Sequence, residues 1–419
     1  MKLLGVSGIS VDVFWGAVEG SGPEQYQWSG YSQLLRIIAD MGFKIKVNLC
    51  MCACELVPLP AWVREVGRAN PDIWYTDKQG ARNEECLSLG VDEVPVLLGR
   101  TALEVYQDFM TSFCHEFSAW LGSPITELLI GLGPNAELRY PSHPAGRWEY
   151  PGTGEFQCYD RFMLSTLRAC AEQKQPPWGR GGPHDACRYK DWPHQSGFFS
   201  ANGSWTSPYG KFFLQWYSEM LARHASLVMG AANEVFGDFP VLLNARIPGC
   251  HWWHSTQSRA AELTTGYYNT AQREGYLPIL GVLTHHGAGV HLSMAEARAV
   301  DRPASHHSDP EGLLLAQRTV AAALHMPVTL ENSDVRFDEA ALARMEAVLF
   351  EPAIHLGIEV PQVQALVVNR MTDAMFEPYN WQRFKGFVRK VRDRADLVGG
   401  ATASMDQHTA RFMALRSNT

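Results

Sequence analysis

The stretch Ile130-Gly131-Leu132-Gly133-Pro134-Asn135-Ala136-Glu137-Leu138-Arg139-Tyr140-Pro141 decides the fold and locates the chemistry. The apolar residues before it predict a buried strand, and its two glycines and its proline end that strand. Glu137 therefore falls in the loop that leaves the strand. An acid at the C-terminal end of a buried parallel strand is typical of the catalytic mouth of a (β/α)8 barrel. The alternative is an ordinary loop carboxylate paired with Arg139, since most glutamates are simply solvated.

A second stretch repeats this arrangement later in the chain. Residues 327–330 form a short apolar run, and Glu331 and Asn332 follow it directly. Two carboxyl groups that flank a glycosidic bond are the minimum equipment for its hydrolysis. One group protonates the leaving oxygen, and the other attacks the sugar or activates a water molecule. The pair Glu137 and Glu331 would meet this minimum requirement if both side chains reach the same site.

Strand-like and helix-like segments alternate along the chain, which predicts a parallel sheet covered by helices. The expected strands are 9–15, 44–52, 127–131, 241–247, 279–284, 290–294, 328–330 and 365–368. The expected helices are 31–41, 102–121, 160–171, 212–236, 312–325 and 381–395. The region from about 141 to 209 is rich in Gly, Pro, Trp and His, which is typical of loops that form a binding cleft.

Composition narrows the possible partners. The 419 residues are 46% hydrophobic and 19% charged, which is ordinary for a soluble globular chain. A net charge of −8 without blocks of Lys or Arg argues against nucleic acid and anionic membranes, and it is compatible with a neutral polysaccharide. No stretch approaches a transmembrane span. The first six residues are too short an apolar run for a secretory signal, which favours a cytoplasmic or plastid protein.

The nine cysteines do not indicate a metal site. Cys50, Cys52 and Cys54 alternate and could hold a metal or act in redox chemistry. They fit better as small apolar residues of a strand, because no second cluster has zinc-ligand spacing. His285 and His286 have no third ligand at metal spacing, so that we interpret them as structural. We expect no metal and no cofactor.

Residues 131–141 closely resemble the general-acid segment of the β-amylases, inverting exo-glucanases that release maltose from starch. Further segments also match the family, in the same order along the chain, at 11–16, 154–160, 251–253 and 260–264. The resemblance extends from about Gly5 into the 390s. It implies one (β/α)8 barrel over residues 1–395. The remaining residues, 396–419, form a C-terminal tail that is expected to fray after Gly399. Because β-amylases have a strand and a helix before the segment that matches Gly5, this gene model is expected to lack the first strand of the barrel, unless another segment fills the gap.

The resemblance also implies roles for individual residues. Glu137 would be the general acid and Glu331 the base that activates water, with the two carboxyl groups roughly 6.5–9.5 Å apart. The implied substrate-binding residues are Asp12, Arg246, His251, Trp252, Ser293, Asn332 and Arg370. Alternatives remain open for three features: Asp12 could cap a turn or helix, Arg370 could be a structural ion-pair partner, and the aromatic residues 251–253 could belong to the core.

Several positions depart from the family pattern. Cys52 stands where β-amylases carry a histidine, and residues 54–57 lead almost directly into Pro58, so that the flexible lid expected there is missing. The other departures are Leu129 for an acidic residue, Arg246 for lysine, Ser293 for threonine and Asp334 for leucine. The missing lid matters most, because lid closure excludes water and completes an active site.

Two functions therefore remain open. The first is exo-hydrolysis of α-1,4-glucosidic bonds in starch or related glucans by a monomer, which would release maltose with inversion. Both glutamates, Asp12, Asn332 and Arg370 favour it. The second is a weakly active or silent β-amylase-like protein that binds glucan or a partner. The loss of the lid and of the histidine at position 52 favours that reading.

Overall fold

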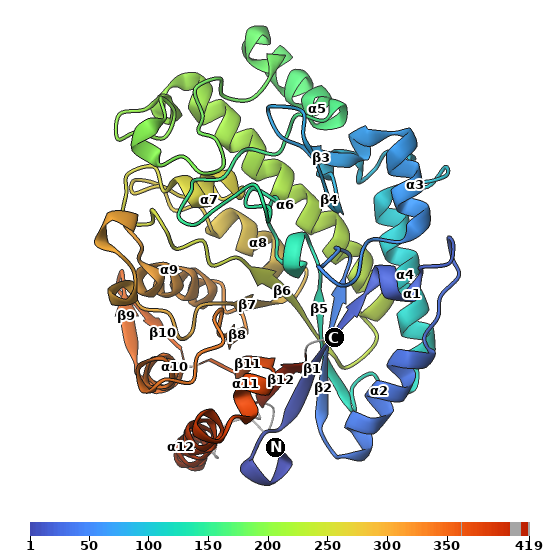
Figure 1. Cartoon of the computed structure of the whole chain (residues 1–419), viewed down its shortest axis with the longest axis vertical. Coiled ribbons are helices and arrows are strands. Elements are labelled where there is room, and N and C mark those ends of the chain that lie inside the picture. The colour runs from blue at the N-terminus through green and yellow to red at the C-terminus, as the bar shows by residue number, and fades with distance from the viewer. Residues whose placement is uncertain (362, 403–411, 418–419) are drawn as a thin grey trace.

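Eight parallel strands form a closed barrel at the centre of the molecule (Figure 1). The computed structural model describes residues 1–361, 363–402 and 412–417. The barrel strands are β1 (Gly8–Phe14), β2 (Lys44–Cys50), β5 (Ile125–Ile130), β6 (Leu242–Ile247), β7 (Gly289–Leu292), β8 (Val328–Glu331), β11 (Ala365–Met371) and β12 (Phe412–Ser417). They neighbour one another in chain order, and β12 returns to pair with β1. The (β/α)8 fold expected from the sequence is confirmed.

Helices surround the strands and connect most of them. They are α1 (Trp15–Val18), α2 (Ser29–Asp40), α3 (Ala61–Ala69), α4 (Ala102–Phe117), α5 (Arg161–Glu172), α6 (Pro208–Phe236), α7 (Ala260–Thr264), α8 (Leu277–His285), α9 (Pro310–Ala323), α10 (Glu339–Phe350), α11 (Asp373–Phe376) and α12 (Pro378–Thr402). Local sequence explains their starts: Thr101 and Glu104 form a capping box on α4, and Ser207 caps α6 ahead of Pro208. No helix in the described part of the chain is long and apolar enough to cross a membrane.

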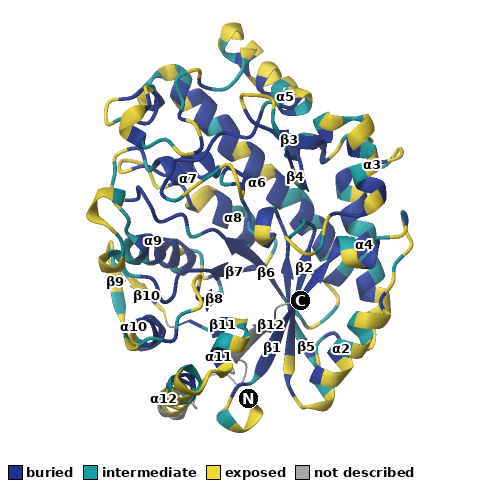
Figure 2. Ribbon diagram, in the orientation of Figure 1, coloured by how far each residue is buried: buried dark blue, intermediate teal, exposed yellow. Residues whose placement is uncertain are grey.

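The core lies between the helices and the barrel wall, and Figure 2 shows buried residues concentrated in the strands, with exposed residues on the outer sides of the helices. Successive strand residues face opposite sides of the sheet. On β1, Val11 and Val13 alternate with Ser10 and Asp12. Asn48 of β2 donates hydrogen bonds to both polar residues, at 3.1 Å to Ser10 Oγ and 2.6 Å to Asp12 Oδ1. The barrel interior is therefore markedly polar.

Strand β12 decides two expectations. The barrel was expected to lack its first strand unless another segment filled the gap, and the tail after Gly399 was expected to fray. Instead Phe412–Ser417 lies between β1 and β11, with Ala414 opposite both Gly8 and Val367. Without this strand the barrel would have two open edges with unpaired backbone groups, and pairing removes both edges at once. The domain boundary at residue 395 is therefore too early, because this barrel strand follows it.

One interior segment was assigned to the wrong structure. Residues 279–284 were expected to form a strand, but they belong to helix α8, and the next barrel strand is β7. A short apolar run fits a buried helix as well as a buried strand, so its pattern alone could not decide. Further elements that the sequence pattern did not indicate are α3, α10 and two small hairpins, β3 (Trp74–Thr76) with β4 (Arg82–Leu87) and β9 (Ala353–His355) with β10 (Ile358–Val360).

Candidate active site

Glu137 stands on a tightly folded loop at the C-terminal end of β5. A short 3-10 turn spans Pro134–Ala136, and Asn135 and Ala136 both have positive φ angles, of 55° and 59°. Such conformations are uncommon outside glycine, and they tend to cluster at functional sites. The N–H group of Leu138 donates to the carbonyl of Arg246 at 2.8 Å. The backbone thus fixes Glu137 beside the end of β6.

The two glycines of this loop are needed for close backbone contacts. A Cβ atom on Gly131 would lie 2.6 Å from the carbonyl oxygen of Leu49 on β2. A Cβ atom on Gly133 would lie 2.6 Å from the carbonyl oxygen of Glu137 and 2.7 Å from that of Arg139. Real Cβ atoms essentially never come this close to backbone atoms. The position of Glu137 therefore depends on the absence of side chains at these two residues.

The side chain of Glu137 is partly buried and contacts Arg139. Arg139 Nε donates to Glu137 Oε2 at 2.6 Å, and the two side chains are 10% and 17% exposed, in that order. This is the pairing that the sequence analysis kept as the alternative to a catalytic role. The ion pair does not decide between the two, because Glu137 still has a second carboxylate oxygen and Arg139 lines the large cleft described below.

Glu331 ends β8 and is 4% exposed. Arg246, on β6, places its Nε atom 3.0 Å from Glu331 Oε1 and donates from Nη2 to Oε2 at 3.3 Å. The Nη1 atom of the same arginine donates to the carbonyl of Asn135 at 2.9 Å. One guanidinium group therefore contacts Glu331 and also the loop that carries Glu137. The two glutamates lie at the same end of the barrel, as the sequence predicted.

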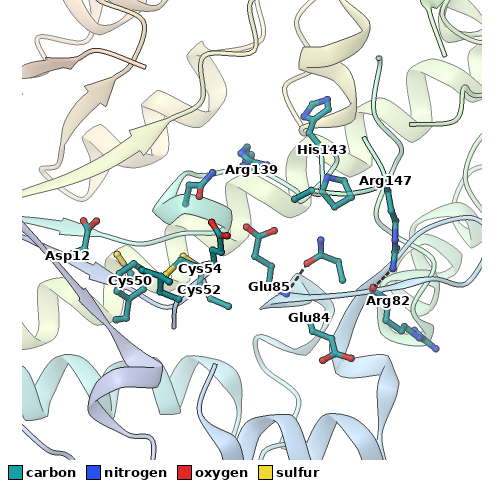
Figure 3. A pocket seen from close by; sticks show the side chains of 18 of the residues that line it. Asp12, Cys50, Cys52, Cys54, Arg82, Glu84, Glu85, Arg139, His143 and Arg147 are labelled. Carbon is teal, nitrogen blue, oxygen red and sulfur yellow. Dashed lines mark hydrogen bonds between the residues drawn. The ribbon is translucent and has the colours of Figure 1, made fainter. Parts of the chain in front are cut away.

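A cleft of about 1140 Å³ opens at this end of the barrel (Figure 3). Asp12 and Arg370, two of the expected substrate-binding residues, line it together with Asn135 and Arg139. Figure 3 shows Cys50, Cys52 and Cys54 next to Asp12, and Arg82 and Arg147 at the opposite end. Arg370 is exposed at the end of β11. A chain of several sugar residues would fit in a cleft of this size.

Four other expected binding residues are buried, and three of them, His251, Trp252 and Asn332, form hydrogen bonds or close polar contacts with protein groups. Trp252 donates from Nε1 to the carbonyl of Gly152 at 2.9 Å and belongs to an aromatic cluster with Trp148 and Tyr150. His251 Nδ1 lies 2.7 Å from Ser308 Oγ, and burial, with a contribution from Arg302, lowers the pKa of His251 to about 4.

Ser293 is 6% exposed, just beyond β7. Asn332 exchanges hydrogen bonds with Asn369 of β11: its Oδ1 accepts from the Asn369 N–H group at 2.6 Å, and its Nδ2 donates to the Asn369 carbonyl. The side chain of Asn332 therefore ties the ends of β8 and β11 together. Substrate contacts by Ser293, Asn332, His251 and Trp252 stay predictions.

Sequence reasoning missed several polar residues of this end of the barrel. Lys46, Glu127 and His291 point into the interior beneath Glu331, and Glu85 of β4 lines the cleft. Burial raises the pKa of Glu85, and the nearby Arg139 opposes this shift. The available signal was a polar residue between apolar ones inside an expected strand, as at Val290-His291-Leu292. Within residues 1–361, 363–402 and 412–417, no group of three or more His, Cys, Asp or Glu is arranged to hold a metal ion.

Known proteins resemble this chain in sequence and in fold. The sequence model of Glycosyl hydrolase family 14 matches residues 1–397. Beta-amylase 2, chloroplastic, of Oryza sativa subsp. japonica is 42% identical over 406 residues, covering 94% of this chain and 72% of the relative. Inactive beta-amylase 4, chloroplastic, of Arabidopsis thaliana is 40% identical over 408 residues, covering 93% and 76%. The crystal structure of the catalytic domain of beta-amylase from Paenibacillus polymyxa has the same fold, with a TM-score of 0.76 at 24% identity, covering 93% of this chain and 92% of that one.

Proposed function

This chain belongs to glycosyl hydrolase family 14, the β-amylase family, and we propose that it hydrolyses α-1,4-glucosidic bonds of starch or a related glucan and releases maltose with inversion. The observation that carries the proposal is the double contact of Arg246 with Glu331 and with the loop of Glu137. It gives the site two carboxyl groups at one mouth, beside a cleft large enough for a glucan chain.

In the proposed reaction Glu137 donates a proton to the glycosidic oxygen of the leaving chain. Glu331 takes a proton from a water molecule, which attacks the anomeric carbon from the opposite face of the sugar and inverts its configuration. The arginine contacts favour the charged form of Glu331, which is the form that a base requires. Asp12 and Arg370 line the cleft and would bind sugar hydroxyl groups.

A weakly active or silent glucan-binding protein is the second candidate. The connection from β2 to α3 is tight, with the Cys54 N–H group donating to the carbonyl of Val57 at 2.9 Å, so that this segment forms a turn rather than a lid. A relative that is 40% identical is named an inactive beta-amylase. Several relatives are named chloroplastic, which is compatible with a plastid location for this chain. That location and a monomeric state are proposals.

The decisive measurement is maltose release from soluble starch by the full-length protein, followed by proton NMR of the first product. We expect β-maltose to appear first, because water attacks the face opposite the leaving chain. Glu137→Gln should lower release by about 10²–10⁴, the usual contribution of a general acid. Glu149→Gln is the control, because Glu149 is exposed and pairs with the exposed Lys190. An initial α-anomer would rule out inversion, and starch binding without hydrolysis would favour the silent protein.

Gly133→Ala should lower glucan hydrolysis at least tenfold. The added Cβ atom would collide with the carbonyl oxygens of Glu137 and Arg139, so the loop must shift, and small misplacements of catalytic groups are costly. Steady-state kinetics on soluble starch would measure the effect. Gly30→Ala is the matched control, because a Cβ atom there meets no atom within 4 Å. Equal activity of the two variants would show that the loop conformation is not required.

A further inference from the structure

A group of charged and polar side chains fills the barrel interior beneath Glu331. It consists of Lys46 on β2, Glu127 on β5, Asn244 and Arg246 on β6, and His291 on β7. Lys46 and His291 are completely buried, with no exposed surface. Burying a charge is costly unless it is paired. We therefore expect these buried charges to serve the function of the site.

The contacts of Lys46 determine where the proton of His291 lies. Lys46 Nζ contacts Glu127 Oε1 and lies 2.7 Å from His291 Nδ1. Burial lowers the pKa of Lys46, and the ion pair with Glu127 opposes this shift and favours the ammonium form. An ammonium group has only donors, so Nδ1 is then the acceptor in this contact. The proton of a neutral imidazole then resides on Nε2, which lies 3.0 Å from Glu331 Oε2. That contact is short but not aligned as a full hydrogen bond; catalytic contacts often become aligned only when substrate binds.

Charge balance requires a neutral His291. Lys46 and Arg246 are positive, and Glu127 and Glu331 are negative, so these four charges already cancel. A proton on Nδ1 would add a fifth charge that faces Lys46 directly, in a region closed to solvent. Burial lowers the pKa of His291 to about 3, and Lys46 lowers it further whereas Glu331 opposes the shift. The ring therefore stays neutral at ordinary pH and keeps its N–H group toward Glu331.

We propose that Lys46 and His291 are positioning residues of the hydrolytic site: Lys46 fixes the His291 ring so that its Nε2–H group faces Glu331 and keeps that side chain ionised and aimed at the attacking water. The inference rests on the proposed function, which makes Glu331 the base. Arg246 holds the same carboxylate from the side of the Glu137 loop. Side chains from two different strands, β6 and β7, thus contact this carboxylate and restrict its rotation.

The first test is a pH profile of kcat/KM on a soluble maltooligosaccharide. A donor to a carboxylate lowers the pKa of that carboxylate, so removing the donor raises the pKa of Glu331. As the pH falls, the variant therefore loses the ionised base, and with it activity, at a higher pH than the wild type does. In His291→Leu we expect kcat to fall about tenfold to a hundredfold, the size of one hydrogen bond to a charged group, with little change in KM. The acidic limb of the profile should move to higher pH. His291→Gln, which can still present an N–H group, should restore most of both.

A structural role alone predicts a different result. His224 is the matched control: it is buried, and its Nδ1 lies 2.9 Å from Asp92 Oδ2 outside the cluster. His224→Leu should lower the melting temperature without moving the acidic limb. If His291→Leu also leaves the limb in place, or if His291→Gln restores nothing, the positioning role is wrong.

The second test does not depend on activity. In the wild-type protein with ¹⁵N-labelled histidine, NMR should show His291 as the neutral tautomer protonated on Nε2 between about pH 5 and 8. Lys46→Met should remove the preference for this tautomer, and Lys46→Arg should keep it. A proton on Nδ1 in the wild type would overturn the inference. An Nε2 proton in a protein that hydrolyses no glucan would instead contradict the proposed function.

Discussion

Glu331→Gln is expected to lower kcat for glucan hydrolysis by about 10²–10⁴, because an amide cannot accept the proton of the attacking water. The substitution is nearly isosteric, so the shape of the site is retained. It also removes the negative partner of Arg246, which is 2% exposed. Breaking a buried ion pair typically costs about 3–5 kcal/mol of stability. The variant should therefore be slower and should also melt at a lower temperature.

Kinetics on soluble starch and thermal unfolding would measure the two effects separately. Glu359→Gln is a suitable control, because it makes the same chemical change at a residue that is exposed on β10. If the Glu331→Gln variant hydrolyses starch within tenfold of the wild-type rate, Glu331 is not the base that activates water. A large loss of rate with an unchanged melting temperature would leave the catalytic role intact and would show that Arg246 finds another partner.

The parts of the site that could be predicted from the sequence are those that local pattern controls. Glu137 and Glu331 each follow a short buried strand, and parallel strands bring their C-terminal ends to one mouth. The interior cluster depends on which strands become neighbours. Lys46 and His291 are 245 positions apart in the sequence, and their contact exists only in the closed barrel. Each looked like an isolated polar residue within an apolar run.

The same limit explains the error over the C-terminal segment. Residues 412–417 are a short run that is apolar at its start, and their local pattern does not distinguish a strand from a frayed end. What makes them a strand is the gap between β1 and β11, which is a property of the whole barrel. Helix α8 shows the converse: a strand-like apolar run became helical because β7 supplies the strand at that place.

Deleting residues 412–419 is expected to lower the melting temperature by many degrees and to abolish activity. Strand β12 pairs with β1 at Gly8, Ile9 and Ser10 and with β11 at Ala365, Leu366, Val367, Val368 and Met371. At about 0.5–1.5 kcal/mol for each hydrogen bond, several kcal/mol are at stake. Activity should fall as well, because β1 carries Asp12 and β11 carries Arg370 into the cleft. Without β12 these two strands have open edges.

A point variant tests the same pairing without shortening the chain. Leu415 lies opposite Ile9 on β1 and Val368 on β11, so its N–H group faces a neighbouring strand on whichever side it points. Leu415→Pro removes that donor from an interior strand, where proline is essentially never found, whereas Leu415→Val keeps it. Thermal unfolding should show a large decrease for proline and a small one for valine. If the proline variant and the truncated chain both melt within about 1 °C of the wild type, a shift worth about 1 kcal/mol for a chain of 419 residues, then β12 does not hold the barrel closed.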